Sequence, residues 1–318
     1  MFNYIVRRVL FAIPIAIGVT IVCFSLVYLA PGDPLQLVLP PDATADDRAI
    51  LATLYGFDKP IPVQYLNWLM RALCGDMGVS IQTSRPVFGE VIRALGNTVV
   101  ISAGAVALAF TLAFILGTVA AYNLGKPADR IATAISVVGV SVPSYWLGIV
   151  LIIWFSVELG WLPATGLGPK GSAGFSFLHW EQARYAILPI VTMSFAPLGI
   201  IARNTRAAIA DVLSQDFVQM LRAKGLGPLP VLRHAVRNAL PQILAVMGLQ
   251  FGYLVGGSIL VETIFNWPGT GFLLGKAILT RDVPVLQGTI LVLAISFVMT
   301  NLVVDLMQTA VDPRIKRS

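Results

Sequence analysis

Six stretches of this chain contain no Asp, Glu, Lys or Arg, and each is long enough to form a membrane-spanning helix. Crossing about 30 Å of hydrocarbon takes roughly 20 helical residues. Backbone groups in hydrocarbon must satisfy their own hydrogen bonds, so these stretches are expected to be helical. They are residues 9–30, 94–124, 131–157, 185–202, 238–261 and 283–304. The sequence therefore predicts an all-α membrane protein with six transmembrane helices.

Composition excludes a soluble globular protein, because 57% of the 318 residues are hydrophobic and only 12% are charged. The basic residues predict the orientation. With six spans both termini share one side, whose connectors hold 13 Lys or Arg against 5 Asp or Glu. The connectors of the other side, residues 31–96, 158–184 and 262–282, hold 9 against 11. Both termini are therefore predicted to be cytoplasmic. The net charge of +6 follows from this asymmetry and implies no nucleic-acid partner.

The longest connector on the predicted cytoplasmic side is residues 203–237. Its first half places apolar residues on one face of a helix. They are Ile209, Val212, Leu213, Phe217, Met220 and Leu221. Glycines and prolines at positions 225–230 predict a turn, followed by a second short helix over 231–237. We expect a cytosolic protein partner to bury the apolar stripe. The alternative is an amphipathic helix that lies on anionic lipid.

Several kinds of chemistry have no support in the sequence. Gly125-Lys126 and Gly275-Lys276 lack the rest of a phosphate-binding loop. His179 and His234 are predicted on opposite sides of the membrane, so they form no shared metal site. No serine in a span has a nearby histidine and acid, which gives no candidate catalytic residue. No ionisable group lies mid-span, although ion-coupled carriers normally need one. The sequence therefore favours a conduit driven by another protein.

Gly248, Gly252 and Gly256 form two overlapping G-x-x-x-G units in the fifth predicted span. Small residues at this spacing let two helices approach closely. We interpret them as helix-packing residues within one subunit. A contact along a transport pathway or at a subunit seam is the alternative.

Several motifs, in order along almost the whole chain, are similar to those of ABC-importer permeases of the dipeptide/oligopeptide/nickel family. Asp216-Phe217-Val218, Arg222-Ala223-Lys224-Gly225-Leu226 and Arg237-Asn238-Ala239-Leu240-Pro241 resemble the family's cytoplasmic "EAA" loop. Further matching motifs are Pro31-Gly32-Asp33-Pro34, Gly75-Asp76-Met77-Gly78, Arg85-Pro86-Val87, Ser141-Val142-Pro143-Ser144-Tyr145-Trp146 and Glu262-Thr263-Ile264-Phe265-Asn266-Trp267-Pro268-Gly269. One departure is Gln219-Met220-Leu221, where the family usually has small, alanine-rich residues.

The resemblance implies a type I ABC-importer permease fold and a coupling helix that docks in a groove of a cytosolic ATPase. The implied coupling residues are Asp216, Phe217, Arg222, Ala223, Lys224, Gly225 and Leu226. It also implies a second homologous permease, two ATPase subunits and an extracytoplasmic substrate-binding protein as partners, in a bacterial inner membrane. ATP and Mg would be bound by the ATPases, and this chain would hold no cofactor.

By this resemblance the chain divides into four parts. Residues 1–30 are a lead-in and first span, 31–93 an extracytoplasmic segment, 94–304 a five-helix permease core with coupling loop 203–237, and 305–318 a cytoplasmic tail. The implied cargo is short peptides; nickel chelates, glutathione and sugar-like solutes are alternatives. A secondary carrier that needs no ATPase and a membrane scaffold or receptor are rivals of other classes.

Overall fold

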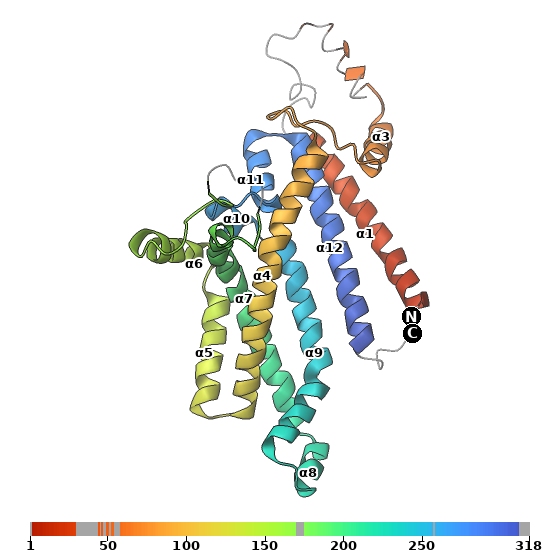
Figure 1. Ribbon diagram of the computed structural model, residues 1–318. Helices are drawn as coiled ribbons and strands as arrows, with labels where there is room; N and C mark the ends of the chain where they lie inside the picture. Colours follow the sequence, from red (N-terminus) through yellow and green to blue (C-terminus); the bar gives the residue numbers. More distant parts are fainter. Residues whose placement is uncertain are drawn as a thin grey trace. The chain divides into compact units, whose positions relative to one another are not determined.

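The computed structural model describes residues 2–29, 44, 46, 49–50, 52–53, 58–169, 175–256 and 258–311. Within these ranges the chain is helical and forms no strand, apart from an isolated bridge between Val79 and Pro86. The helices in Figure 1 are α1 (Phe2–Leu29), α3 (Ile61–Leu73), α4 (Val87–Tyr122), α5 (Pro127–Ser141), α6 (Ser144–Leu151), the π-helical η2 (Ile152–Glu158), α7 (Trp180–Leu213), α8 (Asp216–Ala223), α9 (Pro228–Gly256), α10 (Ile259–Ile264), α11 (Thr270–Thr280) and α12 (Val283–Val311). The predicted all-α fold is confirmed.

Helices cover all six predicted spans, and in the described part of the chain three of them, or four with a bent pair, are long and apolar enough to cross a membrane. By length and apolar composition, α4, α7 and residues Val283–Val304 of α12 can each cross a membrane, and the bent pair α5 with α6–η2 makes a fourth candidate. The other two predicted spans fall on α1 and α9, which have 28 and 29 residues. At 1.5 Å per residue, either helix is about 42 Å long, more than the roughly 30 Å of a bilayer core.

One predicted span is not straight. The axes of Pro127–Ser141 and Ser144–Glu158 differ by 100°, so the expectation of a single helix over 131–157 is wrong. Val142 adopts an extended conformation with ψ 121°, as the residue before a proline tends to do, and Pro143 cannot donate a helical hydrogen bond. Helix α5 alone is about 22 Å long. In Figure 1, α6 accordingly runs across the direction of α5.

The chain forms two compact units. The first comprises Met1–Thr98 with Pro268–Val298, and the second comprises Val99–Trp267 with Met299–Ser318. The domain boundary predicted between residues 93 and 94 falls inside α4, because that helix is continuous from Val87 to Tyr122. The motif predicted at residues 31–34 lies outside the described residues.

In the first unit, α3 packs against α1. The Tyr65 and Thr20 hydroxyl oxygens lie 2.7 Å apart, and the Phe24 ring meets those of Tyr65 and Trp68 at centroid distances of 5.5 and 5.9 Å. Gln287 of α12 donates a hydrogen bond to the Cys23 carbonyl at 3.3 Å. These contacts join three helices of this unit.

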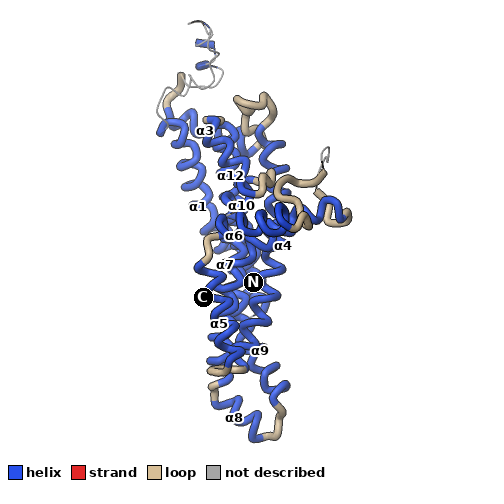
Figure 2. The backbone as a smooth tube through the Cα atoms, turned by 90° about the vertical axis from the view of Figure 1, so that its left-hand side faces the viewer, coloured by secondary structure: helices blue, strands red, loops and turns tan. Residues whose placement is uncertain are grey.

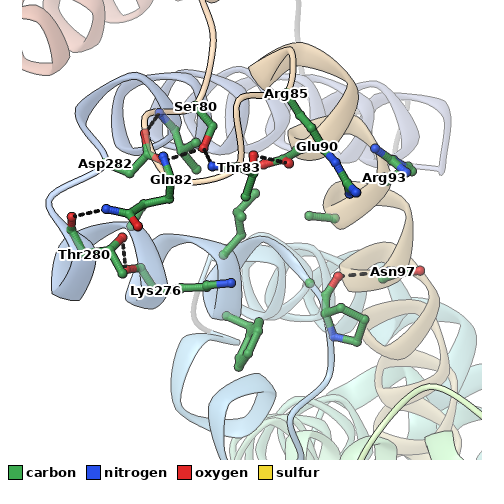
Figure 3. A pocket seen from close by; sticks show the side chains of 17 residues that line it. Ser80, Gln82, Thr83, Arg85, Glu90, Arg93, Asn97, Lys276, Thr280 and Asp282 are labelled. Carbon is green, nitrogen blue, oxygen red and sulfur yellow. Dashed lines mark hydrogen bonds between the residues drawn. The ribbon is translucent and has the colours of Figure 1, made fainter. Parts of the chain in front are cut away.

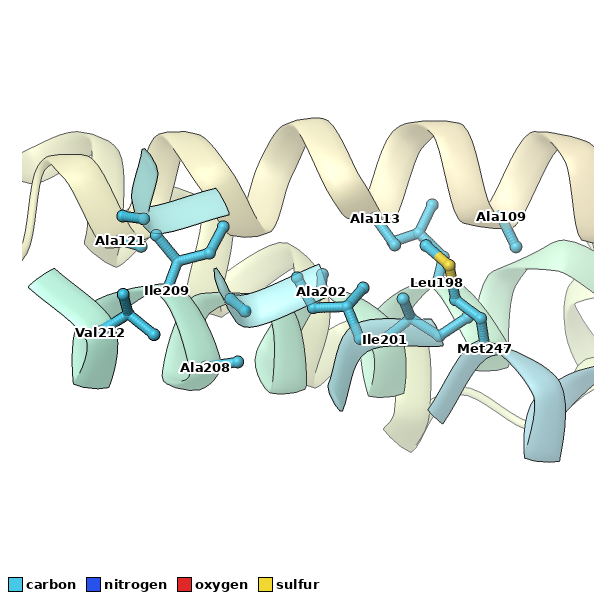
Figure 4. Close-up of a cluster of buried hydrophobic side chains, with 13 residues drawn as sticks. Ala109, Ala113, Ala121, Leu198, Ile201, Ala202, Ala208, Ile209, Val212 and Met247 are labelled. Atoms are coloured by element: carbon cyan, nitrogen blue, oxygen red, sulfur yellow. The ribbon is translucent and has the colours of Figure 1, made fainter. Parts of the chain in front are cut away.

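The second unit has a tightly packed core of small and branched residues. Helix α7 packs against both α5 and α9, and α4 contributes alanines to the same core. Figure 4 shows Ala109, Ala113 and Ala121 of α4 facing Ile201 and Ile209 of α7. A side chain at Gly199 would collide with the Ser136 carbonyl oxygen of α5. Small residues therefore allow the backbones to approach closely, as is usual in membrane helix bundles.

Candidate functional site

The predicted coupling segment consists of the end of α7, the short helix α8 and the beginning of α9. Sequence analysis predicts one continuous helix through residues 209–221, and this is wrong. Helix α7 ends at Leu213, Gln215 is extended with ψ 151°, and α8 begins at Asp216. The Ser214 hydroxyl donates to the Asp211 carbonyl at 2.7 Å, a local bond that competes with helix continuation. Asp216 in the first turn of α8 favours a new helix start.

The predicted turn after α8 is confirmed. Gly225 has φ 82°, and its N–H donates to the Arg222 carbonyl, while the Leu226 N–H donates to the Leu221 carbonyl at 3.2 Å. This pair of bonds is a Schellman motif, which needs a left-handed residue and so favours glycine. Helix α9 then begins with Pro228, a residue suited to a first helical position. The predicted short helix over 231–237 is wrong, because these residues are the first turns of the continuous α9.

The protein itself buries most of the apolar stripe of this segment. Ile209 and Val212 are buried in the core of the second unit, and Phe217 and Leu213 pack against that core. Val218 of α8 is fully buried. The expectation that a partner covers the whole stripe is therefore wrong. Of its six residues, only Met220 is largely exposed, at 58%.

The outward surface of α8 combines charge with a few apolar side chains. Asp216, Arg222, Ala223, Lys224 and Gly225 are exposed, whereas Phe217 and Leu226 are half-buried. Leu229, just after the turn, is 74% exposed. Figure 2 shows α8 between two short loops, joined to α7 and α9. The predicted coupling residues thus form two groups. Asp216 and residues 222–225 are exposed, and we call them the tip of α8. Phe217 and Leu226 are half-buried and hold the tip on the helix bundle.

A small groove of about 310 Å³ lies beside this tip. It is lined by Tyr122, Leu213, Arg222, Leu226, Pro228 and Val231. Four segments therefore meet here: the end of α4, the end of α7, α8 with its turn, and the start of α9. Sequence analysis did not single out Tyr122, since only the fold brings the end of α4 to α8.

Sequence analysis also missed an ion pair between two predicted cytoplasmic connectors. Arg206 of α7 donates to both carboxylate oxygens of Asp129 in the first turn of α5, at 2.5 and 2.8 Å. The side chains are 32% and 6% exposed, respectively. The Arg206 guanidinium, assisted by the Gly125 backbone N–H, holds the pKa of Asp129 well below its usual range. The opposite charges were visible in the sequence, but their 77-residue separation gave no sign of contact.

The predicted glycine repeat differs in its surroundings from one position to the next. A side chain at Gly248 of α9 would collide with the Val304 side chain of α12, whereas a methyl group added at Gly256 would meet no atom within 4 Å. Gly252 is buried. Of the two positions Gly248 and Gly256, close packing against another helix of the chain is therefore seen at Gly248.

Comparison with known proteins identifies the family. The profile described as "Binding-protein-dependent transport system inner membrane component" matches residues 113–317. The chain belongs to this family. A second profile, described as the N-terminal part of such membrane components, matches residues 1–121 of the permease. The two profiles together cover almost the whole chain, so the permease is a multi-pass membrane protein and a transport component.

Individual relatives agree with this assignment over their full lengths. The permease is 39% identical to the dipeptide transport system permease protein DppB of Alkalihalophilus pseudofirmus, over 99% of this chain and 100% of DppB. It is 38% identical to the glutathione transport system permease protein GsiC of Escherichia coli K12, over 99% of each chain. A structure of the MetNI methionine ABC transporter in inward-facing conformations is similar in fold. The TM-score is 0.57 at 19% identity, covering 70% of this permease and 96% of that chain. This similarity agrees with the type I ABC-importer permease fold.

Proposed function

We propose that this permease forms half of the membrane pathway of an ATP-driven importer of short peptides in a bacterial inner membrane. The cargo is inferred from its relatives, which are named as permeases for dipeptides and for glutathione, itself a small peptide. Their similarity extends over the whole chain and includes every segment described above. Nickel chelates and sugar-like solutes are the alternative cargoes, whereas the relatives are named for dipeptides and glutathione.

The exposed tip of α8 is the structural observation that supports an ATPase as the driving partner of this permease. Arg222, Lys224 and Met220 are exposed in and just after α8, whereas Val218 of the same helix is buried in the bundle. An amphipathic helix with apolar and charged anchors suits a groove in a protein partner. A displacement of α8 would therefore pass directly to α7 and α9. In this proposal ATP and Mg bind to the partner, and the permease holds no cofactor and catalyses no reaction.

The remaining partners follow from the family and the charge distribution. Both termini and α8 lie in the cytoplasm, because the connectors on that side carry the excess of Lys and Arg. An extracytoplasmic binding protein delivers cargo to the opposite side, where residues 31–96 and 158–184 lie. A second, homologous permease completes the pathway, and one ATPase subunit docks on each permease.

The test is uptake of a radiolabelled dipeptide by proteoliposomes that contain the complete importer. We expect uptake to need ATP and the binding protein. Reversing both charges in the tip, with Arg222→Glu and Lys224→Glu, should abolish uptake and ATPase binding while membrane insertion is unchanged. Lys126→Glu, which changes an exposed cation outside α8, is the matched control and should retain uptake. Uptake driven by an ion gradient without ATPases would instead identify a secondary carrier.

A further inference from the structure

The first unit contains a second polar cavity, which the coupling segment does not use. It has a volume of about 370 Å³ and lies between residues 80–85, the first turns of α4, and α11. Arg85, Arg93 and Lys276 contribute its cations, one from each wall, and we call it the cationic cleft (Figure 3). All three residues are exposed to solvent.

Hydrogen bonds between the walls hold the cationic cleft in shape. The buried Asp282 carboxylate accepts bonds from the Ser80 hydroxyl at 2.5 Å and from the Gln82 N–H at 3.3 Å, so residues 80–82 are attached to the start of α12. Asn97 of α4 donates to the Pro268 carbonyl at 2.9 Å, just before α11. The site is therefore built from three connected walls and does not depend on one flexible loop.

The acidic groups of the cationic cleft are already engaged by neutral donors. Glu90 accepts a hydrogen bond from the Thr83 hydroxyl at 2.8 Å, and Asp282 is occupied as described above. Within the described part of the chain, the one ion pair found joins Arg206 to Asp129, so no carboxylate pairs with Arg85, Arg93 or Lys276. Three cations thus surround a cavity that lies within the usual range for small-molecule sites, about 300–1,000 Å³.

We infer that the cationic cleft binds the carboxylate end of a short peptide. A guanidinium matches the geometry of a carboxylate with two parallel hydrogen bonds, and an ammonium adds a compact positive charge. Phe272 and Leu273, which also line the cavity, offer apolar surface to a neighbouring peptide side chain. The inference rests on the proposed function in two ways: it takes peptides as cargo, and it places residues 31–96 and 262–282 on the side from which cargo arrives.

The test measures peptide binding to the complete importer in nanodiscs, without ATP and without the binding protein. Equilibrium dialysis compares alanyl-phenylalanine with alanyl-phenylalanine amide, which lacks the carboxylate. We expect the acid to bind about tenfold more tightly than the amide, because the amide has no carboxylate to contact the cations of the cleft. Arg85→Gln combined with Lys276→Gln should remove this preference. Arg71→Gln, which changes an exposed cation of α3 outside the cleft, is the matched control.

Three results would overturn the inference. The acid and the amide could bind equally well, or the double variant could keep the preference of the wild type. The double variant could also lose stimulation by the binding protein with its affinity for the peptide unchanged, which would make the cleft a docking site for an acidic protein surface. Failure of the proposed function is distinguishable, because it appears as absence of ATP-dependent peptide uptake by the wild-type importer.

Discussion

Arg206 and Asp129 join α7 to the start of α5 by two parallel hydrogen bonds between a guanidinium and a carboxylate. Arg206 lies two helical turns before the end of α7, so the pair is next to the segment that leads into α8. It links the proposed ATPase-coupling region to α5, whose axis differs by 100° from that of the segment after Pro143. A bidentate pair resists rotation as well as separation. We therefore expect it to keep α5 and α7 moving together during transport.

Removing either partner should reveal this linkage. Arg206→Gln leaves a largely buried Asp129 without its cation, and it should lower both the apparent melting temperature of the permease and its uptake rate. Asp129→Asn combined with Arg206→Gln should recover part of the loss, because no buried charge then remains unpaired. The measurement is a double-mutant cycle on melting temperature and on uptake. Additive effects of the two substitutions would show that the residues do not act as a pair.

The ion pair between Arg206 and Asp129 also makes the stability of the permease depend on pH. The fold lowers the pKa of Asp129 below the ordinary carboxyl value of about 3.9. The stability that the ionised Asp129 contributes is therefore fully present above that ordinary value, and it is lost as the pH falls towards the pKa of Asp129 in the folded protein. Wild type should therefore exceed Asp129→Asn in melting temperature by a constant amount between about pH 5 and 8. The difference should shrink below about pH 4. A difference that instead grew on acidification would contradict the assigned direction.

Gly225 provides a test of the turn after α8. Its φ of 82° is strained for any residue with a side chain, although nothing lies within 4 Å of an added Cβ. Gly225→Ala should cost about 1 kcal/mol locally and reduce coupling to the ATPase. Gly227→Ala is the control, because Gly227 also has open space and has no positive φ. ATPase activity stimulated by the binding protein should fall in the first variant alone.

Gly199 tests the close approach of α5 and α7. An added methyl group would collide with the Ser136 carbonyl oxygen, and backbone cannot move aside as a flexible side chain can. Gly199→Ala should therefore destabilise the permease by about 1–3 kcal/mol. Gly96→Ala on α4 adds the same methyl group to open space and should be neutral or slightly stabilising. Thermal unfolding of the two variants in the same detergent makes the comparison.

Features set by composition could be predicted from the sequence, and features set by distant contacts could not. Uncharged runs located the membrane-spanning candidates, because a bilayer imposes length and polarity on each one separately. The ends of those helices were harder to predict. The periodicity of residues 209–221 continues through Ser214, yet the helix breaks there, and a proline at 143 is compatible with a slight kink as well as with the observed bend of 100°.

The candidate site shows the same division. The motif located α8, and the glycine with the following proline located its turn, since both act through local backbone geometry. The direction in which the apolar stripe faces depends on α4 and α9, which lie far away in the sequence. For this reason the periodicity alone points to a partner, although Ile209 and Val212 belong to the protein's own core. The ion pair between Arg206 and Asp129 could not be predicted either, because the two residues are also far apart in the sequence.

The two faces of α8 lead to the last prediction. Val218 is fully buried, whereas Met220, two residues later, is 58% exposed. Val218→Ala removes two buried methyl groups and should destabilise the permease by about 2 kcal/mol. Met220→Ser should leave the melting temperature unchanged but weaken ATPase binding, because its side chain lies on the proposed docking surface. Melting temperature and co-purification of the ATPase separate the two effects. If Met220→Ser retains full ATPase binding and transport, the docking surface does not include this apolar anchor, and the charges of Arg222 and Lys224 must supply the contact.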